Sequence, residues 1–370
     1  MPLEDWFDRY QYEIDYDIGE SGIKYLNLDS LGIDLGSLGL RYGYHTGSPE
    51  LRRLIANEYE EFSPDQIAVT TGSSEANFSV IASLVDTSHH IVVEYPNYPS
   101  LYEVPRSLGL PYDLFQLTYE ENFEPNLERL GNLIKDGTSL VTLTHPNNPT
   151  GSVISDKTLR EVIALVEAHD AYLLHDETYR ELSFSKPPPP AATLSDRALS
   201  MTTVSKAYGL PGIRIGWVAG PKKIIESVRA VREQVTICNS TLSEAIALAA
   251  LKQKDSILKS AKERVQRNFE VLKRWMAHQD SLEWVEPTGG VVAFPRLKTD
   301  ASTEALCRLL VTKYRTFSIP GYTFGMDRHM RIGFGGSTDE LNEGLARLKL
   351  AMEECASTDN MTSMLPAKIS

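Results

Sequence analysis

Three polar residues in the middle of the chain could together form a site for Schiff-base chemistry, in which the amine of a lysine reacts with a carbonyl compound. Lys206 follows a short apolar run and precedes a Gly/Pro-rich loop, where desolvation would lower the pKa of its amine and favour Schiff-base formation. Asn148 and Asp176 lie earlier in the chain, each at the end of another apolar run. A lone lysine after a strand is usually structural, so only the three residues together indicate a reactive site.

The elements that must position these side chains are short apolar runs that alternate with segments of helical periodicity. This alternation favours an α/β domain built on a mainly parallel sheet. Ligands of such sheets bind beyond the carboxyl ends of the strands, so the three side chains should converge on one crevice and their spacing fits a cofactor site. The predicted strands are residues 67–71, 91–95, 140–144, 172–175, 200–204 and 215–219.

The pattern changes toward the C-terminus. Residues 222–278 are helical in pattern, with a break near 253–256, and short strands (291–294, 329–334) and two helices (303–313, 339–354) follow. This change predicts a smaller α+β C-terminal domain. We therefore expect an N-terminal segment over the active site (1–40), a large domain (41–275), a small domain (276–356) and a flexible tail (357–370).

Composition excludes several classes of function. The net charge of −13 and the pI near 5.2 would repel a phosphate backbone, so we expect no nucleic-acid partner. Three cysteines without a C-x-x-C pair encode neither a disulfide framework nor a cysteine-based zinc site, and the histidines show no metal-ligand spacing. No apolar run is long enough to predict a membrane span, and the acidic, aromatic N-terminus lacks the apolar region of a secretion signal. Together with the cysteine usage, which implies a reducing compartment, this predicts a cytoplasmic location.

Three motifs together resemble those of pyridoxal 5'-phosphate enzymes of fold type I, in the class I/II aminotransferase family. They are HPNNPTG (145–151), HDETY (175–179) and SKAYGLPGIRIG (205–216), and the resemblance extends over residues 42–334. It implies an α/β fold with a mainly parallel, seven-stranded sheet in the large domain. It also implies pyridoxal phosphate as the cofactor, an amino acid as the substrate and a homodimer with shared active sites.

The resemblance gives four residues roles at the reacting centre. Lys206 would hold the cofactor covalently and move a proton on the substrate. Asp176 would lie under the pyridine nitrogen and keep it protonated, so that the ring can accept electrons. Tyr179 and Asn148 would hydrogen-bond the phenolic oxygen of the ring.

Four further residues would hold the cofactor phosphate. Ser73 and Ser74 belong to TGSSEA (71–76), which lies between a predicted strand and a helix, and a helix N-terminus favours an anion. Thr203 and Arg214 flank the lysine and resemble the remaining phosphate ligands. Thr203 stands where the family more often has serine, and the hydroxyl is retained.

The resemblance extends to the ring stack, the partner subunit and the substrate. Tyr98 would stack on the pyridine ring, and Tyr42 would reach the phosphate of the neighbouring subunit. Arg331 would bind the substrate α-carboxylate, and an arginine in an apolar strand pattern independently favours a ligand. His45 is either a proton shuttle near the substrate or an ordinary loop histidine.

Fold type I hosts transamination, decarboxylation, elimination, replacement and cyclisation, so the cofactor motifs leave the reaction open. Relatives specific for dicarboxylates have a second arginine beyond the lysine. Here QVTICN (234–239) occupies that region, and the nearest basic residue is Arg232. We therefore expect an aminotransferase whose preferred donor is neither aspartate nor glutamate.

The N-terminal segment keeps a second reaction open. LEDW (3–6) and DIGESGI (17–23) resemble the start of the capreomycidine synthase group of arginine-modifying enzymes. That resemblance implies cyclisation, elimination or oxidation of an arginine-like amino acid in a natural-product pathway. The many acidic residues of this segment either present carboxylates to a cationic substrate or form a solvated acidic face.

Overall fold

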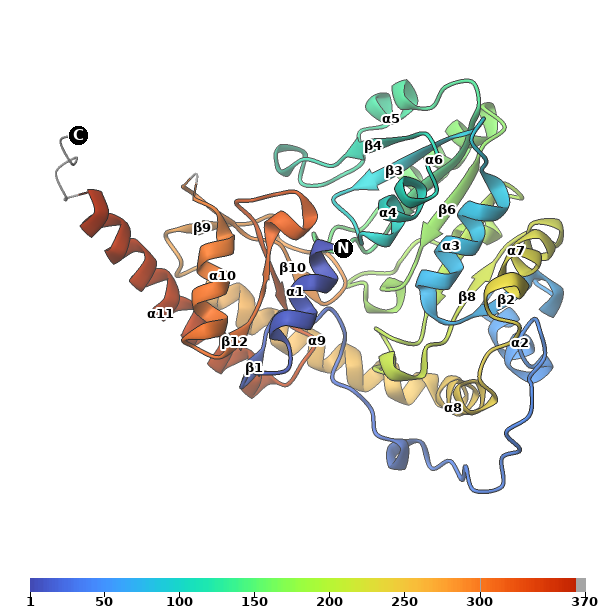
Figure 1. The fold of residues 1–370 in the computed structure, drawn as a ribbon, viewed down its shortest axis with the longest axis horizontal. Helices are drawn as coiled ribbons and strands as arrows, with labels where there is room; N and C mark the ends of the chain where they lie inside the picture. The colour runs from blue at the N-terminus through green and yellow to red at the C-terminus, as the bar shows by residue number, and fades with distance from the viewer. Residues whose placement is uncertain (300, 364–370) are drawn as a thin grey trace. The chain divides into compact units, whose positions relative to one another are not determined.

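The computed structural model describes residues 1–299 and 301–363, and the chain divides into two compact units. The larger unit contains Gly22–Glu263 and Val285–Val291, and the smaller contains Met1–Ser21, Arg264–Trp284 and the described residues from Val292 onward (Figure 1). This division differs from the expected one. The boundary falls inside a single long helix, α9 (Lys254–Met276), and the segment 1–40 is shared between the units.

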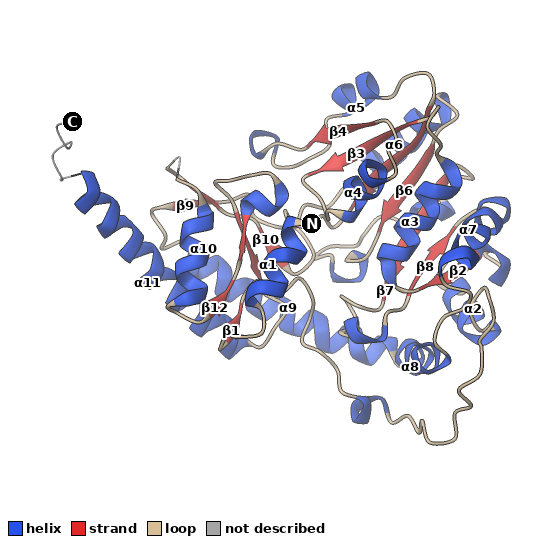
Figure 2. Cartoon of the chain, viewed as in Figure 1, coloured by secondary structure: helices blue, strands red, loops and turns tan. Residues whose placement is uncertain are grey.

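A seven-stranded sheet forms the centre of the larger unit, with helices in front of and behind it (Figure 2). The strand order is β2-β8-β7-β6-β5-β3-β4, and only β8 runs antiparallel to its neighbours. The expected mainly parallel sheet is confirmed. Its strands are β2 (Ile67–Thr70), β3 (His90–Tyr95), β4 (Tyr112–Gln116), β5 (Thr138–Thr144), β6 (Tyr172–Asp176), β7 (Ala198–Thr203) and β8 (Gly216–Ala219).

All six strands predicted for this sheet are present. Strand β4 is the one strand of the sheet that the sequence did not predict. Its sequence, YDLFQ, has only one fully buried side chain, Phe115. Because β4 is an edge strand with a single neighbour, it needs no continuous apolar run.

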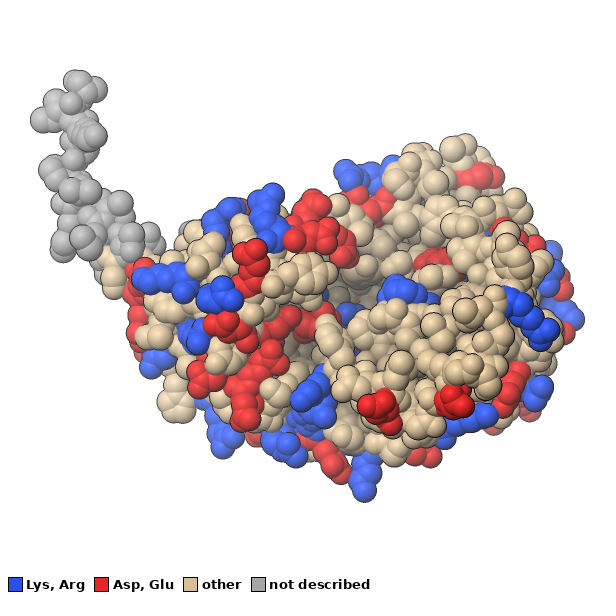
Figure 3. Space-filling model, turned by 60° about the horizontal axis from the view of Figure 1, so that its bottom comes forward, with Lys and Arg blue, Asp and Glu red and all other residues tan. Residues whose placement is uncertain are grey.

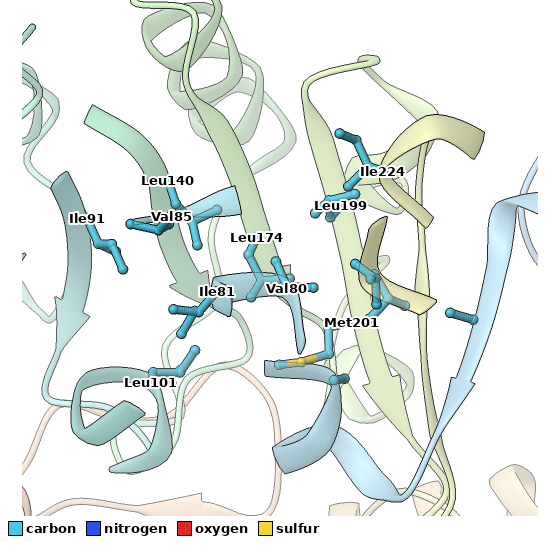
Figure 4. Packing of buried hydrophobic residues seen from close by; sticks show 14 of the residues in the cluster. Val80, Ile81, Val85, Ile91, Leu101, Leu140, Leu174, Leu199, Met201 and Ile224 are labelled. Carbon is cyan, nitrogen blue, oxygen red and sulfur yellow. The ribbon is translucent and has the colours of Figure 1, made fainter. Parts of the chain in front are cut away.

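Apolar helix faces fix the helices on this sheet. One core cluster joins α3 residues such as Val80 and Ile81 to Leu140, Leu174 and Leu199 of the strands (Figure 4). This packing holds the N-terminus of α3 beside the start of β8. The helices are α2 (Pro49–Ala56), α3 (Gly72–Leu84), α4 (Ser100–Ser107), α5 (Leu127–Leu133), α6 (Asp156–Ala168), α7 (Lys222–Val235) and α8 (Thr241–Lys252).

The smaller unit combines short strands with three helices of its own. Residue Gly333 is required where β14 meets the N-terminal segment, because a Cβ there would lie 1.9 Å from the Glu20 carbonyl oxygen. The elements are α1 (Pro2–Tyr10), β1 (Tyr16–Asp17), β9 (Leu282–Glu283), β10 (Val292–Ala293), β11 (Arg296–Leu297), α10 (Thr303–Thr312), β12 (Thr316–Phe317), β13 (Ile319–Pro320), β14 (Met330–Gly333) and α11 (Thr338–Ser363).

The C-terminal tail differs in part from the prediction. Residues 357–363 continue helix α11, since the sequence contains no Gly or Pro there to end it. Residues 364–370 of the predicted tail lie outside the described residues.

Acidic and basic side chains are interspersed on the face shown in Figure 3. None of the described helices has both the length and the apolar character that crossing a lipid bilayer requires. The expected lack of a nucleic-acid partner stays a prediction.

Candidate active site

The carboxyl ends of three adjacent parallel strands bring the predicted central residues to one edge of the sheet. Asp176 ends β6, Asn148 follows β5, and Lys206 follows β7, with β6 paired to both of the other strands. Asn148 and Asp176 are buried and Lys206 is half-buried. This arrangement has the geometry that the parallel-sheet argument predicted.

Asp176 is a buried carboxyl group that forms no ion pair with a lysine or arginine among the described residues. Its Oδ1 accepts a hydrogen bond from the Thr178 backbone N–H at 2.9 Å. Burial raises the pKa of this carboxyl, and the hydrogen bonds from Thr178 act against that rise. A protonated ring nitrogen beside Asp176 would supply the missing positive charge, so the site fits a pyridinium group.

The loop that carries Lys206 is held by residues of the N-terminal segment. The Ile23 N–H donates to the Lys206 carbonyl at 3.3 Å, and the Leu26 N–H donates to the Gly209 carbonyl at 3.0 Å. Gly209 has φ +65°, and a Cβ on it would lie 2.7 Å from the Lys24 carbonyl oxygen. The lysine loop is therefore fixed by backbone contacts, which limits how far Lys206 can move.

The N-terminus of α3 forms a cradle of backbone amides. Ser73 and Ser74 lie in its first turn, where N–H groups have no intrahelical acceptor. Gly72 has φ +80°, and a Cβ on it would lie 2.5 Å from the Arg214 guanidinium. The arginine thus lies directly against the helix N-terminus, and this pairing of a cation with free amides fits a phosphate group.

Thr203 and Ser205 form a hydroxyl pair between β7 and Lys206. Their hydroxyl oxygens are 2.8 Å apart, and the Thr203 hydroxyl lies 2.7 Å from the Ile215 carbonyl oxygen. Thr203 therefore ties the end of β7 to the segment before β8. The sequence analysis gave Ser205 no role, although Ser205 directly precedes Lys206 in the chain.

Tyr98 and Tyr179 flank this edge of the sheet. Tyr98 is half-buried, and its backbone N–H donates to the Asn97 side chain at 2.7 Å. Tyr179 is 3% exposed and packs against Gly290. Their proposed contacts with the cofactor ring stay predictions.

Tyr42 and His45 lie in a more open loop. Tyr42 is 83% exposed and, with Tyr44 and Glu244, lines a cavity of about 500 Å³. The His45 side chain is also exposed, and its Nδ1 lies 3.6 Å from Glu233. These positions leave Tyr42 accessible to a second subunit and give His45 no contact of its own with Lys206 or Asp176 among the described residues.

Arg331 belongs to the smaller unit and is buried there, with 1% of its surface exposed. Its guanidinium donates twice to the Gly19 carbonyl, at 3.2 and 2.7 Å, and lies over the rings of Phe7 and Phe324. The burial inferred from the apolar strand pattern is therefore present. Its role as carboxylate ligand stays a prediction.

Arg232 is fully engaged inside the larger unit. Its Nε donates to Glu75 at 3.2 Å, one terminal nitrogen donates to Asn239 at 2.6 Å, and the other donates to the His45 carbonyl. The side chain is 1% exposed, and all three of its nitrogens have acceptors within the larger unit.

A buried polar layer lies behind the central residues, and sequence reasoning missed it. Glu94 is 0% exposed and accepts hydrogen bonds from the Thr144 backbone and from Asn97 and Asn147. A signal was present, since Glu94 is an acidic residue within an apolar strand. Among the described residues no group of His, Cys, Asp or Glu side chains could hold a metal ion.

Known proteins share this fold and these sequence features over most of the chain. The Streptomyces vinaceus capreomycidine synthase is 32% identical over 94% of this chain and 92% of its own length. A PLP-dependent aminotransferase from Streptococcus suis 89-1591 superposes with a TM-score of 0.91 at 30% identity, over 95% of this chain and 97% of its own. The PLP-dependent cyclase OrfR gives a TM-score of 0.88 at 28% identity, with the same coverage.

The fold and these relatives thus define a pyridoxal-phosphate-dependent transferase of fold type I. Residues 21–348 match the family described as aminotransferase class I and II, and the chain belongs to that family. Pyridoxal phosphate is therefore its cofactor.

Proposed function

We propose that this enzyme is an aminotransferase for an α-amino acid that lacks a side-chain carboxylate. Arg232 carries the substrate part of the proposal. It is the basic residue nearest to the region where dicarboxylate-specific relatives have a second arginine, and its guanidinium is already bound to Glu75, Asn239 and a backbone carbonyl. A substrate carboxylate would have to displace a buried ion pair, which costs several kcal/mol.

Four residues would do the chemical work. Bound pyridoxal phosphate supplies an electron-accepting ring. Lys206 would bind the cofactor and, as a neutral amine, take and return the proton at the substrate Cα. Asp176 would hold the proton on the ring nitrogen, and Asn148 and Tyr179 would donate to the ring oxygen. The burial of Asn148, Asp176 and Tyr179 supports these roles, because a dry site strengthens each interaction.

Arg331 is the proposed ligand of the α-carboxylate. Its guanidinium is held by the Gly19 carbonyl and by two aromatic rings, so its orientation is restricted. A pre-oriented guanidinium can bind a carboxylate bidentately with little loss of side-chain entropy.

A second candidate is cyclisation, elimination or oxidation of an arginine-like amino acid in a specialised biosynthetic pathway. The 32% identity with capreomycidine synthase over nearly the whole chain favours it. The acidic N-terminal residues give it less support than the sequence suggested. Asp15 pairs with Arg315 at 2.9 Å and lies 3.6 Å from Arg347, and Asp17 accepts the backbone N–H groups of Gly19 and Glu20.

The fate of the cofactor separates the two candidates. With amino acid alone, an aminotransferase should release about one keto acid per active site and then stop until a keto-acid acceptor is added. Product should be measured with leucine, phenylalanine, arginine and aspartate as donors. Continued turnover of arginine without an acceptor would contradict transamination and favour the second candidate.

We also propose a homodimer whose sites are shared between subunits. Two observations support it: Tyr42 is exposed beside a cavity of about 500 Å³, and Leu40, Tyr44, Val235 and Ile237 are also exposed apolar or aromatic side chains. Large exposed apolar and aromatic side chains are enriched at interfaces between proteins. A reducing, cytoplasmic setting is proposed as well, since Cys238, Cys307 and Cys355 are free thiols.

Mixing two inactive variants tests the shared site. Tyr42→Phe and Lys206→Ala subunits, unfolded together and reassembled, should recover about a quarter of wild-type activity, because half of the random dimers contain one intact composite site. Each variant refolded alone is the control. No recovery in dimers verified as mixed would mean that Tyr42 acts within its own subunit or not at all.

A further inference from the structure

Two buried side chains, Glu94 and His145, face each other in the polar layer behind Asp176. Glu94 Oε1 and His145 Nε2 are 3.4 Å apart, and both side chains are almost completely inaccessible to solvent. Neither of these two atoms has a hydrogen-bond partner within the described chain. An acid and a base left together in a dry site can hold one proton between them.

The backbone connects this pair to Asp176. Thr144 and His145 are consecutive residues at the end of β5: the Thr144 N–H donates to Glu94 at 2.8 Å, and the His145 N–H donates to the Asp176 carbonyl at 3.1 Å. Thr144 and Asp176 are also direct partners in the β5–β6 register. The end of β5 therefore links the Glu94 side chain to the backbone of Asp176.

Burial shifts both groups toward their neutral forms. Burial raises the pKa of Glu94 to about 8, and the negative charge of Asp176 adds to the rise. Burial, followed by the nearby His175, lowers the pKa of His145. Other charged groups near His145 are Glu177 and Arg180, which line the same small cavity. The proton of the pair is therefore on Glu94. When Glu94 loses this proton to solvent at higher pH, its carboxylate is left as a buried negative charge.

We propose that Glu94 and His145 form a proton-sharing pair whose charge state sets the electrostatic potential at Asp176 and, through it, at the cofactor ring nitrogen. Glu94 is then a positioning residue, because it acts through Asp176 and not on the substrate. The inference rests on the role proposed for Asp176.

The test is the absorption spectrum of the purified holoenzyme, recorded between about pH 6 and pH 10. Ionisation of Glu94 should add a step near pH 8 to the wild-type spectrum. Glu94→Gln should lack this step, and Glu103→Gln, which changes a glutamate in a surface ion pair, should keep it. His145→Phe should move the step up by about one pH unit, because ionised Glu94 loses its nearest ring nitrogen.

A step that is unchanged in Glu94→Gln or in His145→Phe would overturn the proposal. Asp176→Asn distinguishes this failure from a failure of the underlying role. If Asp176→Asn alters the spectrum and Glu94→Gln does not, only the proton-sharing pair is wrong. If neither alters it, the role of Asp176 is wrong as well.

Thermal unfolding provides a readout that does not depend on the spectrum. The pKa of Glu94 is higher in the folded protein than in the unfolded chain. Its contribution to the free energy of unfolding is therefore fully present below its ordinary pKa and is lost as the pH rises through about 8. The melting temperature should therefore fall less between pH 7 and 9 in Glu94→Gln than in wild type. If Glu94→Gln fails to fold, Glu94→Asp replaces it: a displaced spectral step supports the pair, and an unchanged one overturns it.

Discussion

Replacing Lys206 by alanine is expected to lower turnover by at least about four orders of magnitude, because the variant loses both the amine that binds the cofactor and the base that moves the Cα proton. The fold should survive, since backbone hydrogen bonds from residues 23 and 26 hold the lysine loop. Keto-acid formation measures the loss. Borohydride reduction followed by peptide mass analysis measures covalent attachment of the cofactor.

Lys222→Ala is the matched control for this experiment. Lys222 lies on α7, and its amine forms an exposed ion pair with Asp65 at 3.1 Å. We expect this variant to keep both the adduct and the activity. A reduced adduct on another lysine of the wild-type protein would show that Lys206 is not the attachment site.

Replacing Asp176 by alanine should lower turnover about a thousandfold or more, because the ring nitrogen would lose the carboxylate that keeps it protonated. The apoenzyme should be no less stable than wild type. Asp176 is buried without a lysine or arginine partner in the described chain, so removing it takes away an uncompensated carboxylate. Turnover and the melting temperature of the apoenzyme separate these two effects.

Two further variants sharpen the result. Asp176→Glu should keep more activity than Asp176→Ala, since it retains an acidic group. Asp196→Ala, at an exposed position, should behave as wild type. Near-normal turnover of Asp176→Ala would mean that this enzyme works without a protonated ring nitrogen.

The sequence predicted the parts of the fold that depend on local patterns. Residues 140–144 and 172–175 are mainly apolar runs, and interior strands of a parallel sheet are buried on both faces, so these strands were found. Strand β4 was missed because an edge strand tolerates polar side chains. The boundary between the two compact units falls inside α9, whose uninterrupted helical pattern gives no local signal of a boundary.

The central residues were also predictable, for a related reason. Asn148, Asp176 and Lys206 each follow a strand in the sequence, and parallel strands place their carboxyl ends at one edge. The buried layer behind them was not predicted. Glu94 and His145 are far apart in the sequence, and only the pairing of β3 with β5 brings their side chains to within 3.4 Å of each other.

The sequence by itself determined the class of the protein, because strand pattern and motif spacing are local properties that the chain carries before it folds. The tertiary structure decided which charged groups remain available for chemistry. It bound Arg232 to Glu75 and Asn239, and Asp15 to Arg315, and it buried Glu94 beside His145. The physical reason is that the charge state and accessibility of a group depend on burial and on partners that are distant in the sequence.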